Sequence, residues 1–453
     1  MFRIRWSDPE QDDLTSPGDW RQPSLVLATL FWNFLFWDDF AARLPFSGPP
    51  LVYFSFLAGG TLLLIALFYL GPALAAQSGK QPLFALVEES LGVLPALGIR
   101  VCCTIFWTCW MAVITETLTR WLLSFWIGQR ISPMVTGLVP CAILLYLYTT
   151  GAQGLRTSAR LAWFTNKFSL AIVIAAFIRV RWGLPSAWES LSGPGSLAGE
   201  PYTWPGSADL TFYAAPLMFL AADFTRNRTR RQSLLIGLFG LALPFAGGIS
   251  LSGLVGTATY AIHRNSGSVG NFGGAVLYND SGRFVPVKLL LIGFTLFGAV
   301  RFGARALADV VSISWISKLP QRIVLGGILC GTAALSVLSG NRSVDLLDAL
   351  ELPARILVAT AAVLAVDFVV RSNRLHQHQR MDWIAMLALL AGCGLPYYVS
   401  QLAELSYVVI GWPFATTLDL EPWSHPWLLP VYGTSFLFCL TGRLVQGVSG
   451  KVS

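Results

Sequence analysis

Long apolar runs recur along this chain from Leu25 to the C-terminus, and they constrain the fold more than any other feature. A helix needs about 20 mainly apolar residues to cross the hydrocarbon core of a bilayer. Only 12% of the residues are charged, which is about half the share found in soluble domains. The pattern therefore predicts an all-α integral membrane protein with many spans.

Hydropathy and chain breaks divide these runs into about twelve transmembrane helices. The predicted spans cover residues 24–45, 50–75, 92–126, 131–150, 158–180, 208–225, 231–262, 285–312, 320–340, 343–370, 381–402 and 425–446. With the N-terminus inside, the inner segments hold about twice as many Lys and Arg residues as the outer ones, as the positive-inside rule requires. We therefore expect residues 1–23 and 447–453 to be cytoplasmic tails.

Several classes of protein fit the composition poorly. The seven cysteines all fall in apolar runs, without zinc-ligand or disulfide spacing. The first 23 residues carry five carboxylates and no short apolar core with a cleavage site, so we expect no cleavable signal peptide. The positive charges lie mainly in loops and do not alternate with aromatics, which disfavours a nucleic-acid partner. The four histidines form no ligand set, and we predict no cofactor, no metal site and no catalytic residues.

The stretch Thr211–Arg231 begins as a span, contains Pro216, and ends in Asp223 followed by four arginines. Proline removes one bond of the helical ladder. Inside a membrane the freed groups must be satisfied by protein or by a water-filled cavity, and broken helices of this kind form the midplane substrate sites of transporters. Two interpretations remain open: a break that binds a ligand, or a proline kink without one.

Four local motifs resemble the nucleobase:cation symporter-1 family, which contains cytosine/purine, uracil, allantoin and hydantoin permeases. AADFTRN at Ala221 is similar to the family's ending of span six, and AVDFVVRSNR at Ala365 to its ending of span ten. The segment Leu70–Gly92 is similar to the loop and helix between spans two and three. Trp110 falls where the family has a tryptophan in span three. The resemblance covers about residues 25–380.

This resemblance implies a leucine-transporter-type fold in a bacterial inner membrane. Residues 24–380 would form the transporter core, with inverted five-helix repeats at about 24–180 and 208–370 and with spans one and six broken. Residues 381–446 would add two further transmembrane helices. In the family, the substrate base stacks between aromatics of spans three and six, and a sodium ion lies between spans one and eight.

The expected substrate site lies around Trp110 and the break in span six. A flat heterocycle stacks on an aromatic face without a fixed hydrogen-bond pattern, although Trp110 could equally pack between helices. The family's second aromatic maps near Tyr213 or Ala214, and in the latter case Phe212 or Tyr213 would compensate. The candidate substrate-binding residues are Asn33, Trp37, Trp110, Phe212, Tyr213, Ala214, Ala215 and Pro216.

Span eight departs from the family pattern. The two hydroxyl residues that bind sodium in the family fall at Arg301 and Phe302 in this chain, and neither side chain offers an oxygen. Arg301, Arg305 and Asp309 recur every four residues and so share one helix face. We expect Arg301 to occupy the ion's place as a fixed cation, with a purely structural ion pair as the alternative.

Three further charges are candidates for ion or proton coupling. Asp38 and Asp39 lie near the end of span one, and carboxylates inside a membrane are costly and usually functional. They would be natural partners for Arg301, unless span one ends early and leaves them in outside water. Lys167 in span five would carry a proton if it is desolvated, or it would snorkel to the interface.

The sequence thus predicts a secondary active transporter, or permease, for a small nitrogen heterocycle such as a nucleobase or a hydantoin-like compound. It would work by alternating access without sodium, either as a proton symporter or as a facilitator or exchanger. The alternative is a sensor or structural membrane protein on the same fold that no longer transports. An enzyme is disfavoured, because Asp38 and Asp39 lack a second acidic motif. The substrate, direction and oligomeric state stay open, and a monomer is plausible.

Overall fold

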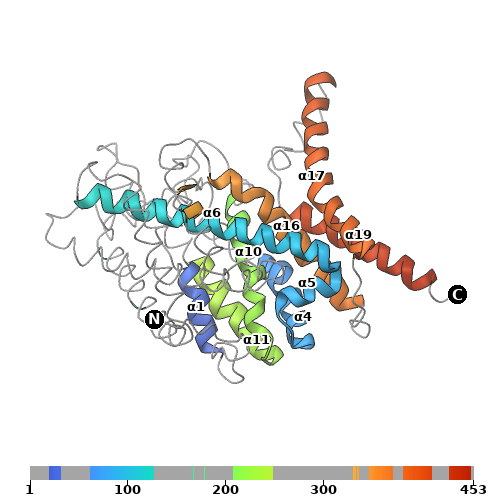
Figure 1. The fold of residues 1–453 in the computed structure, drawn as a ribbon, viewed down its shortest axis with the longest axis horizontal. Coiled ribbons are helices and arrows are strands. Elements are labelled where there is room, and N and C mark those ends of the chain that lie inside the picture. Colours follow the sequence, from blue (N-terminus) through green and yellow to red (C-terminus); the bar gives the residue numbers. More distant parts are fainter. Residues whose placement is uncertain are drawn as a thin grey trace, which may run out of the picture. The chain divides into compact units, whose positions relative to one another are not determined.

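The computed structural model is helical, and the parts of the chain that it describes are drawn as coloured ribbons in Figure 1. It describes residues 20–31, 62–126, 208–247, 330–332, 334–335, 346–370, 381–410 and 428–449, together with positions 167 and 178. The predicted spans 131–150 and 285–312 lie outside this part of the chain, as do most of 158–180 and 320–340.

The chain divides into two compact units that interleave along the sequence. One unit comprises Met1–Leu62, Trp107–Tyr202 and Leu234–Leu347, and the other Leu63–Phe106, Thr203–Ser233 and Asp348–Ser453. Each unit therefore takes segments from both of the predicted five-helix repeats. In the first unit, α1 (Arg21–Phe31) packs against a π-helical segment, η6 (Gly237–Ala242), where Gly240 lies close to Ser24 and Leu27.

The second predicted span continues past its expected end at residue 75. It contains a π-helical segment, η3 (Ile65–Leu70), which runs directly into α4 (Gly71–Gly79). The small apolar residues after Gly71 favour continued helix, and four of them are buried. The helix ends where Lys80 adopts a left-handed conformation at φ 51°. The short helix α5 (Leu83–Leu91) follows and stops at Gly92, whose φ of 93° suits a residue without a Cβ.

The long third and sixth spans occur close to their predicted bounds. α6 covers Val93–Trp126 without interruption. α10 covers Ala208–Ala221 and tightens into a short 3₁₀ segment, η5 (Ala222–Thr225), before α11 begins (Arg230–Ile236). These bounds follow the apolar runs, since a helix that buries its backbone bonds internally is the economical way to cross lipid.

The last three described helices are α16 (Leu346–Val370), α17 (Trp383–Ile410) and α19 (Leu428–Ser449). α17 and α19 lie side by side (Figure 1). Gly392 faces Val431, and Gly442 faces Ile384, so the two helices run antiparallel. Small residues at such contacts let helix backbones approach closely, as is usual inside membranes.

The described helices include long apolar segments and leave large apolar side chains exposed. Among the described residues, two helices are long and apolar enough to cross a bilayer, Leu62–Gly79 and Leu352–Val370. Large apolar side chains remain exposed on α17 and α19. Trp383 and Leu387 on α17, and Leu437 and Val445 on α19, are each about 59% to 69% exposed, as expected for side chains that face lipid.

Candidate functional site

Pro216 lies within a continuous helix, which corrects one expectation from the sequence. The unwound segment predicted at Tyr213–Pro216 does not occur, because α10 runs as α-helix from Ala208 to Ala221. A proline lacks only its own N–H, so the ladder on either side can persist when packing holds the helix together. Here Ala215 and the residues from Leu217 to Ala222 are buried. The backbone departs from α geometry only after Ala221, in η5.

The buried face of α10 packs against the π-helical segment η3. Phe68 and Tyr69 from η3 are both fully buried. The Tyr69 hydroxyl donates a hydrogen bond of 2.8 Å to the Ser233 carbonyl in α11, and the Phe68 ring meets Tyr432 of α19 edge-on at 5.4 Å between centroids. Single π-turns within helices are frequent at functional sites, so η3, packed against α10, draws attention to the region next to the predicted substrate stretch.

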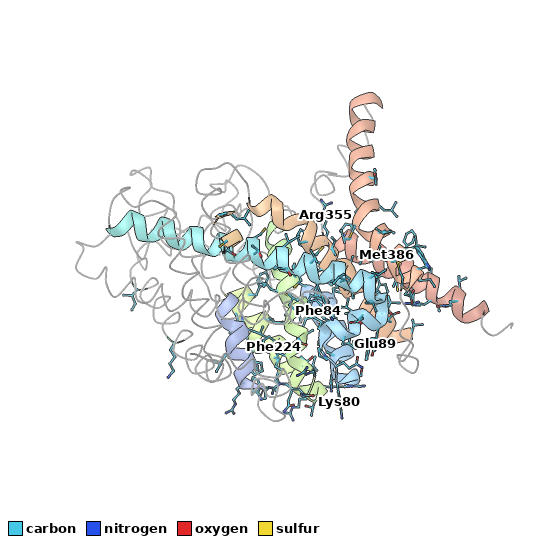
Figure 2. All side chains as sticks on the ribbon, viewed as in Figure 1. Lys80, Phe84, Glu89, Phe224, Arg355 and Met386 are labelled. Atoms are coloured by element: carbon cyan, nitrogen blue, oxygen red, sulfur yellow. The ribbon has the colours of Figure 1, made fainter. Side chains whose placement is uncertain are left out.

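The AADFTRN segment joins span six to the connection that follows span two. The Leu83 amide begins α5 behind Pro82, and no side chain of its own turn caps it. The Asp223 carboxylate accepts this N–H at 2.9 Å. The Thr225 hydroxyl lies 3.0 Å from the Ala73 carbonyl oxygen. Figure 2 shows the side chains of this region, with Phe224 and Lys80 labelled.

These contacts give the segment a role that the sequence did not reveal. In the sequence, AADFTRN resembles a family motif and helps to predict the orientation in the membrane. In the structure, Asp223 and Thr225 tie the end of span six to α4 and α5. The signal available in the sequence was indirect: a helix that starts at Pro82-Leu83 without a capping residue needs an acceptor from elsewhere.

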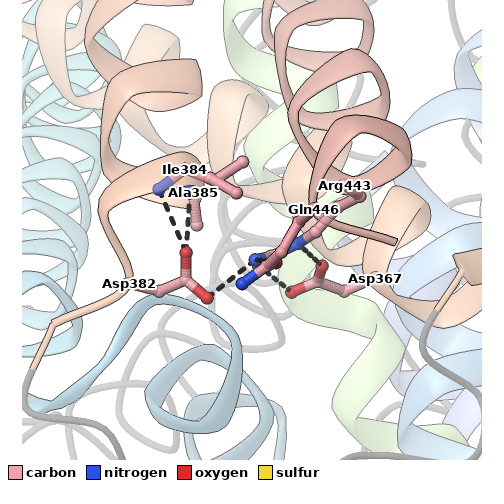
Figure 3. Close-up of polar contacts among 6 residues, drawn as sticks. All are labelled: Asp367, Asp382, Ile384, Ala385, Arg443 and Gln446. Atoms are coloured by element: carbon pink, nitrogen blue, oxygen red, sulfur yellow. Dashed lines mark hydrogen bonds and ion pairs between the residues drawn. The ribbon is translucent and has the colours of Figure 1, made fainter. Parts of the chain in front are cut away.

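The second Asp-Phe motif, at the end of span ten, forms a buried ionic cluster (Figure 3). Arg443 of α19 binds Asp367 of α16 in a bidentate manner, with Nε–Oδ1 at 2.9 Å and Nη2–Oδ2 at 3.3 Å. The same guanidinium donates from Nη1 to Asp382 Oδ2 at 2.8 Å. The three side chains are 2%, 1% and 7% exposed for Arg443, Asp367 and Asp382. We call these three residues the Arg443 cluster.

Asp382 also organises the start of α17. Its Oδ1 accepts the amides of Ile384 and Ala385 at 3.1 and 3.2 Å, which caps the first turn. Its own amide donates to the Leu91 carbonyl at the end of α5, at 3.0 Å. The cluster therefore brings together the ends of α5, α16, α17 and α19.

The predicted site residues fall partly within the described chain. Trp110 belongs to α6, and Phe212, Tyr213 and Ala214 belong to α10. Ala215 and Pro216 are buried in α10. Lys167 is helical and exposed, and its role as a proton carrier stays a prediction. The remaining candidates lie outside the described residues: Asn33, Trp37, Asp38, Asp39, Arg301 and Arg305.

Several solved structures that match this chain are of membrane transporters. An inward-facing structure of Mhp1 matches with a TM-score of 0.59 at 12% identity, over 94% of this chain and 91% of Mhp1. Mhp1, described as a nucleobase-cation-symport-1 family transporter, also matches in a closed conformation with bromovinylhydantoin bound, with a TM-score of 0.54 at 13% identity over 93% and 91%. A sodium-coupled sialic acid symporter in a substrate-bound outward-open state matches with a TM-score of 0.58 at 14% identity, over 94% and 88%.

No protein-family model and no curated protein sequence matches the chain. The structural matches extend over nearly the whole chain and nearly the whole of each transporter. The protein is therefore a helical, multi-pass membrane protein with the leucine-transporter-type fold of these transporters.

Proposed function

We propose that this protein is a secondary active transporter for a small, flat nitrogen heterocycle such as a nucleobase or a hydantoin-like compound. The observation that carries the proposal is the match over more than 90% of both chains to Mhp1, whose structure contains a bound hydantoin. The Asp-Phe endings of spans six and ten add independent support from the sequence. Transport would proceed by alternating access, in a bacterial inner membrane, with both termini in the cytoplasm.

Within this proposal, Trp110 supplies the stacking face for the substrate ring, and Asn33, Trp37 and the residues from Phe212 to Pro216 complete the site. The continuous α10 changes how span six would contribute. The helical hydrogen bonds of α10 continue on both sides of Pro216. α10 can therefore offer the substrate its side chains and the one carbonyl that the proline leaves without a partner. It would not offer an unwound stretch of backbone.

We further propose that transport does not depend on sodium. Sodium prefers oxygen ligands, and Arg301 and Phe302 stand where the family has hydroxyl residues. Asp38, Asp39 and Lys167 are then the candidates for proton coupling. Without such coupling, Arg301 and Arg305 would serve as fixed charges in a facilitator or exchanger.

The test is uptake of radiolabelled uracil, cytosine, allantoin and hydantoin into proteoliposomes. We expect uptake of at least one compound above that of empty liposomes, with a proton gradient raising it and a sodium gradient leaving it unchanged. Strong stimulation by sodium would contradict the sodium-independent mechanism. If folded protein neither transports nor binds any of the four compounds, a non-transporting sensor or structural role on the same fold would replace the transporter.

A Trp110→Ala variant tests the site. Stacking of a base on an aromatic ring contributes about 1–3 kcal/mol, so KM should rise by about five- to 150-fold. Tyr398→Ala is the matched control, because it also removes an aromatic ring but from an exposed position of α17. Equal KM values for Trp110→Ala and the wild type would remove Trp110 from the site.

A further inference from the structure

The Arg443 cluster places three charged side chains in the protein interior, where charge is costly unless it is paired and hydrogen-bonded. The pairing is nearly complete. Asp367 receives two hydrogen bonds from the guanidinium, and Asp382 receives one from the guanidinium and two from backbone amides (Figure 3). Such a geometry is built by three helices together, and none of them could provide it alone.

The charges within the cluster are balanced unequally. Two carboxylates face one guanidinium, but Asp382 also lies at the N-terminus of α17, where the helix dipole favours an anion. Asp367 lies in the last turn of α16, where the dipole disfavours one. The helix dipoles therefore stabilise the charge of Asp382 and oppose the charge of Asp367.

The cluster also connects parts of the chain that play different roles in the proposed transporter. α16 is span ten, the last helix of the predicted core, whereas α17 and α19 are the two additional helices. α17 and α19 pack on each other near Gly392 and Gly442, and the cluster fixes that pair to the end of α16 and, through Asp382, to the Leu91 carbonyl.

We propose that Arg443 is a positioning residue that clamps the end of span ten to spans eleven and twelve, so that these three ends move as one body during the transport cycle. The two additional helices would then act as a brace for the core. This inference rests on the proposed transport function, because only a transport cycle requires some helices to move and others to stay together.

Distances between spin labels test the clamp directly. Val369 on α16 and Val445 on α19 are 71% and 69% exposed and lie close in sequence to Asp367 and Arg443. Labels at these positions, in a background without native cysteines, should give one narrow distance distribution in lipid nanodiscs. The distribution should stay unchanged between acidic and neutral pH and with or without added uracil or hydantoin.

The Arg443→Gln variant should broaden this distribution, and Arg231→Gln should not, because Arg231 is an exposed arginine on α11 outside the cluster. A second label pair, Leu352 and Val369, lies within α16 and should keep its distance in every variant. If the wild-type distance between Val369 and Val445 shifts between conditions, the three ends do not move together and the proposal is wrong. A narrow distribution in Arg443→Gln would overturn it equally.

Transport kinetics separate positioning from a purely structural role. For variants that elute as monodisperse protein, we expect Arg443→Gln to lose most of its Vmax while KM stays close to that of the wild type, and Arg443→Lys to recover part of the rate. Unchanged Vmax in folded Arg443→Gln would contradict a role in transport. If Arg443→Gln fails to fold, Asp367→Asn, which removes one charge and keeps the shape, takes its place in both measurements.

The two proposals fail in distinguishable ways. Absence of uptake by the wild type would refute the transport function. The label distances do not depend on uptake, and they would still show whether the cluster holds the three helix ends together.

Discussion

Asp223 illustrates what single residues do in this protein and why the sequence alone does not reveal it. In the sequence, its segment AADFTRN resembles a family motif, and the arginines that follow predict that this end of the span is cytoplasmic. Its partner is the Leu83 amide, 140 residues away in the chain. A hydrogen bond between distant segments leaves no periodic pattern in the sequence, so the motif could be recognised while its contact could not.

Replacing Asp223 with Ala should destabilise the protein by about 1–3 kcal/mol, because Leu83 is buried and its amide would lose an acceptor. Asp223→Asn should cost less, since an amide oxygen can accept the same hydrogen bond. Thermal unfolding in detergent provides the measurement. Equal stability of Asp223→Ala and the wild type would mean that the contact contributes nothing.

For the helices, the lengths of the apolar runs predicted the bounds well, but they did not predict where the helical geometry changes within a helix. α6, α16 and the α10–η5 helix occur near their predicted bounds because each coincides with one long apolar run. The π-helical segments η3 and η6 were not predicted, since hydropathy does not distinguish one helical period from another. The break predicted at Pro216 was wrong for a different reason. A proline in the sequence is a local signal of a helix break, but packing around Ala215 and Leu217 maintains the helix.

The contact between α17 and α19 gives a test at this scale. A Cβ added at Gly392 would meet the Ser435 side chain and lie 2.9 Å from the Val431 carbonyl oxygen, whereas one added at Gly394 would meet nothing within 4 Å. Gly392→Ala should therefore cost about 1–3 kcal/mol through overpacking, and Gly394→Ala should be tolerated.

Each variant adds one methyl group to α17, so their melting temperatures in detergent can be compared directly. A lower value for Gly392→Ala alone would confirm the close approach of the two helices. Similar values for both variants would mean that α17 and α19 do not pack through Gly392.

For the whole molecule, the apolar pattern predicted a multi-pass membrane protein, and the structural matches support that class and the transporter fold. The candidate site is harder to predict from the sequence than the protein class. Its predicted residues come from spans one, three, five, six and eight, and their mutual placement is a tertiary property. Asp38, Asp39 and Arg301 remain predictions because they lie outside the described residues.

Orientation is the property of the whole molecule that the sequence predicts most directly, because it depends only on where Lys and Arg fall. A green fluorescent protein fused to the C-terminus should fluoresce in a bacterial host, and alkaline phosphatase fused at the same place should be inactive, since both reporters would lie in the cytoplasm. A dark fluorescent protein and an active phosphatase would show that the C-terminus lies outside the cytoplasm, contrary to the predicted topology. Arg443, which lies in α19 six residues before Ser449, would then join the outer ends of the helices, and the clamp would act on the opposite side of the membrane.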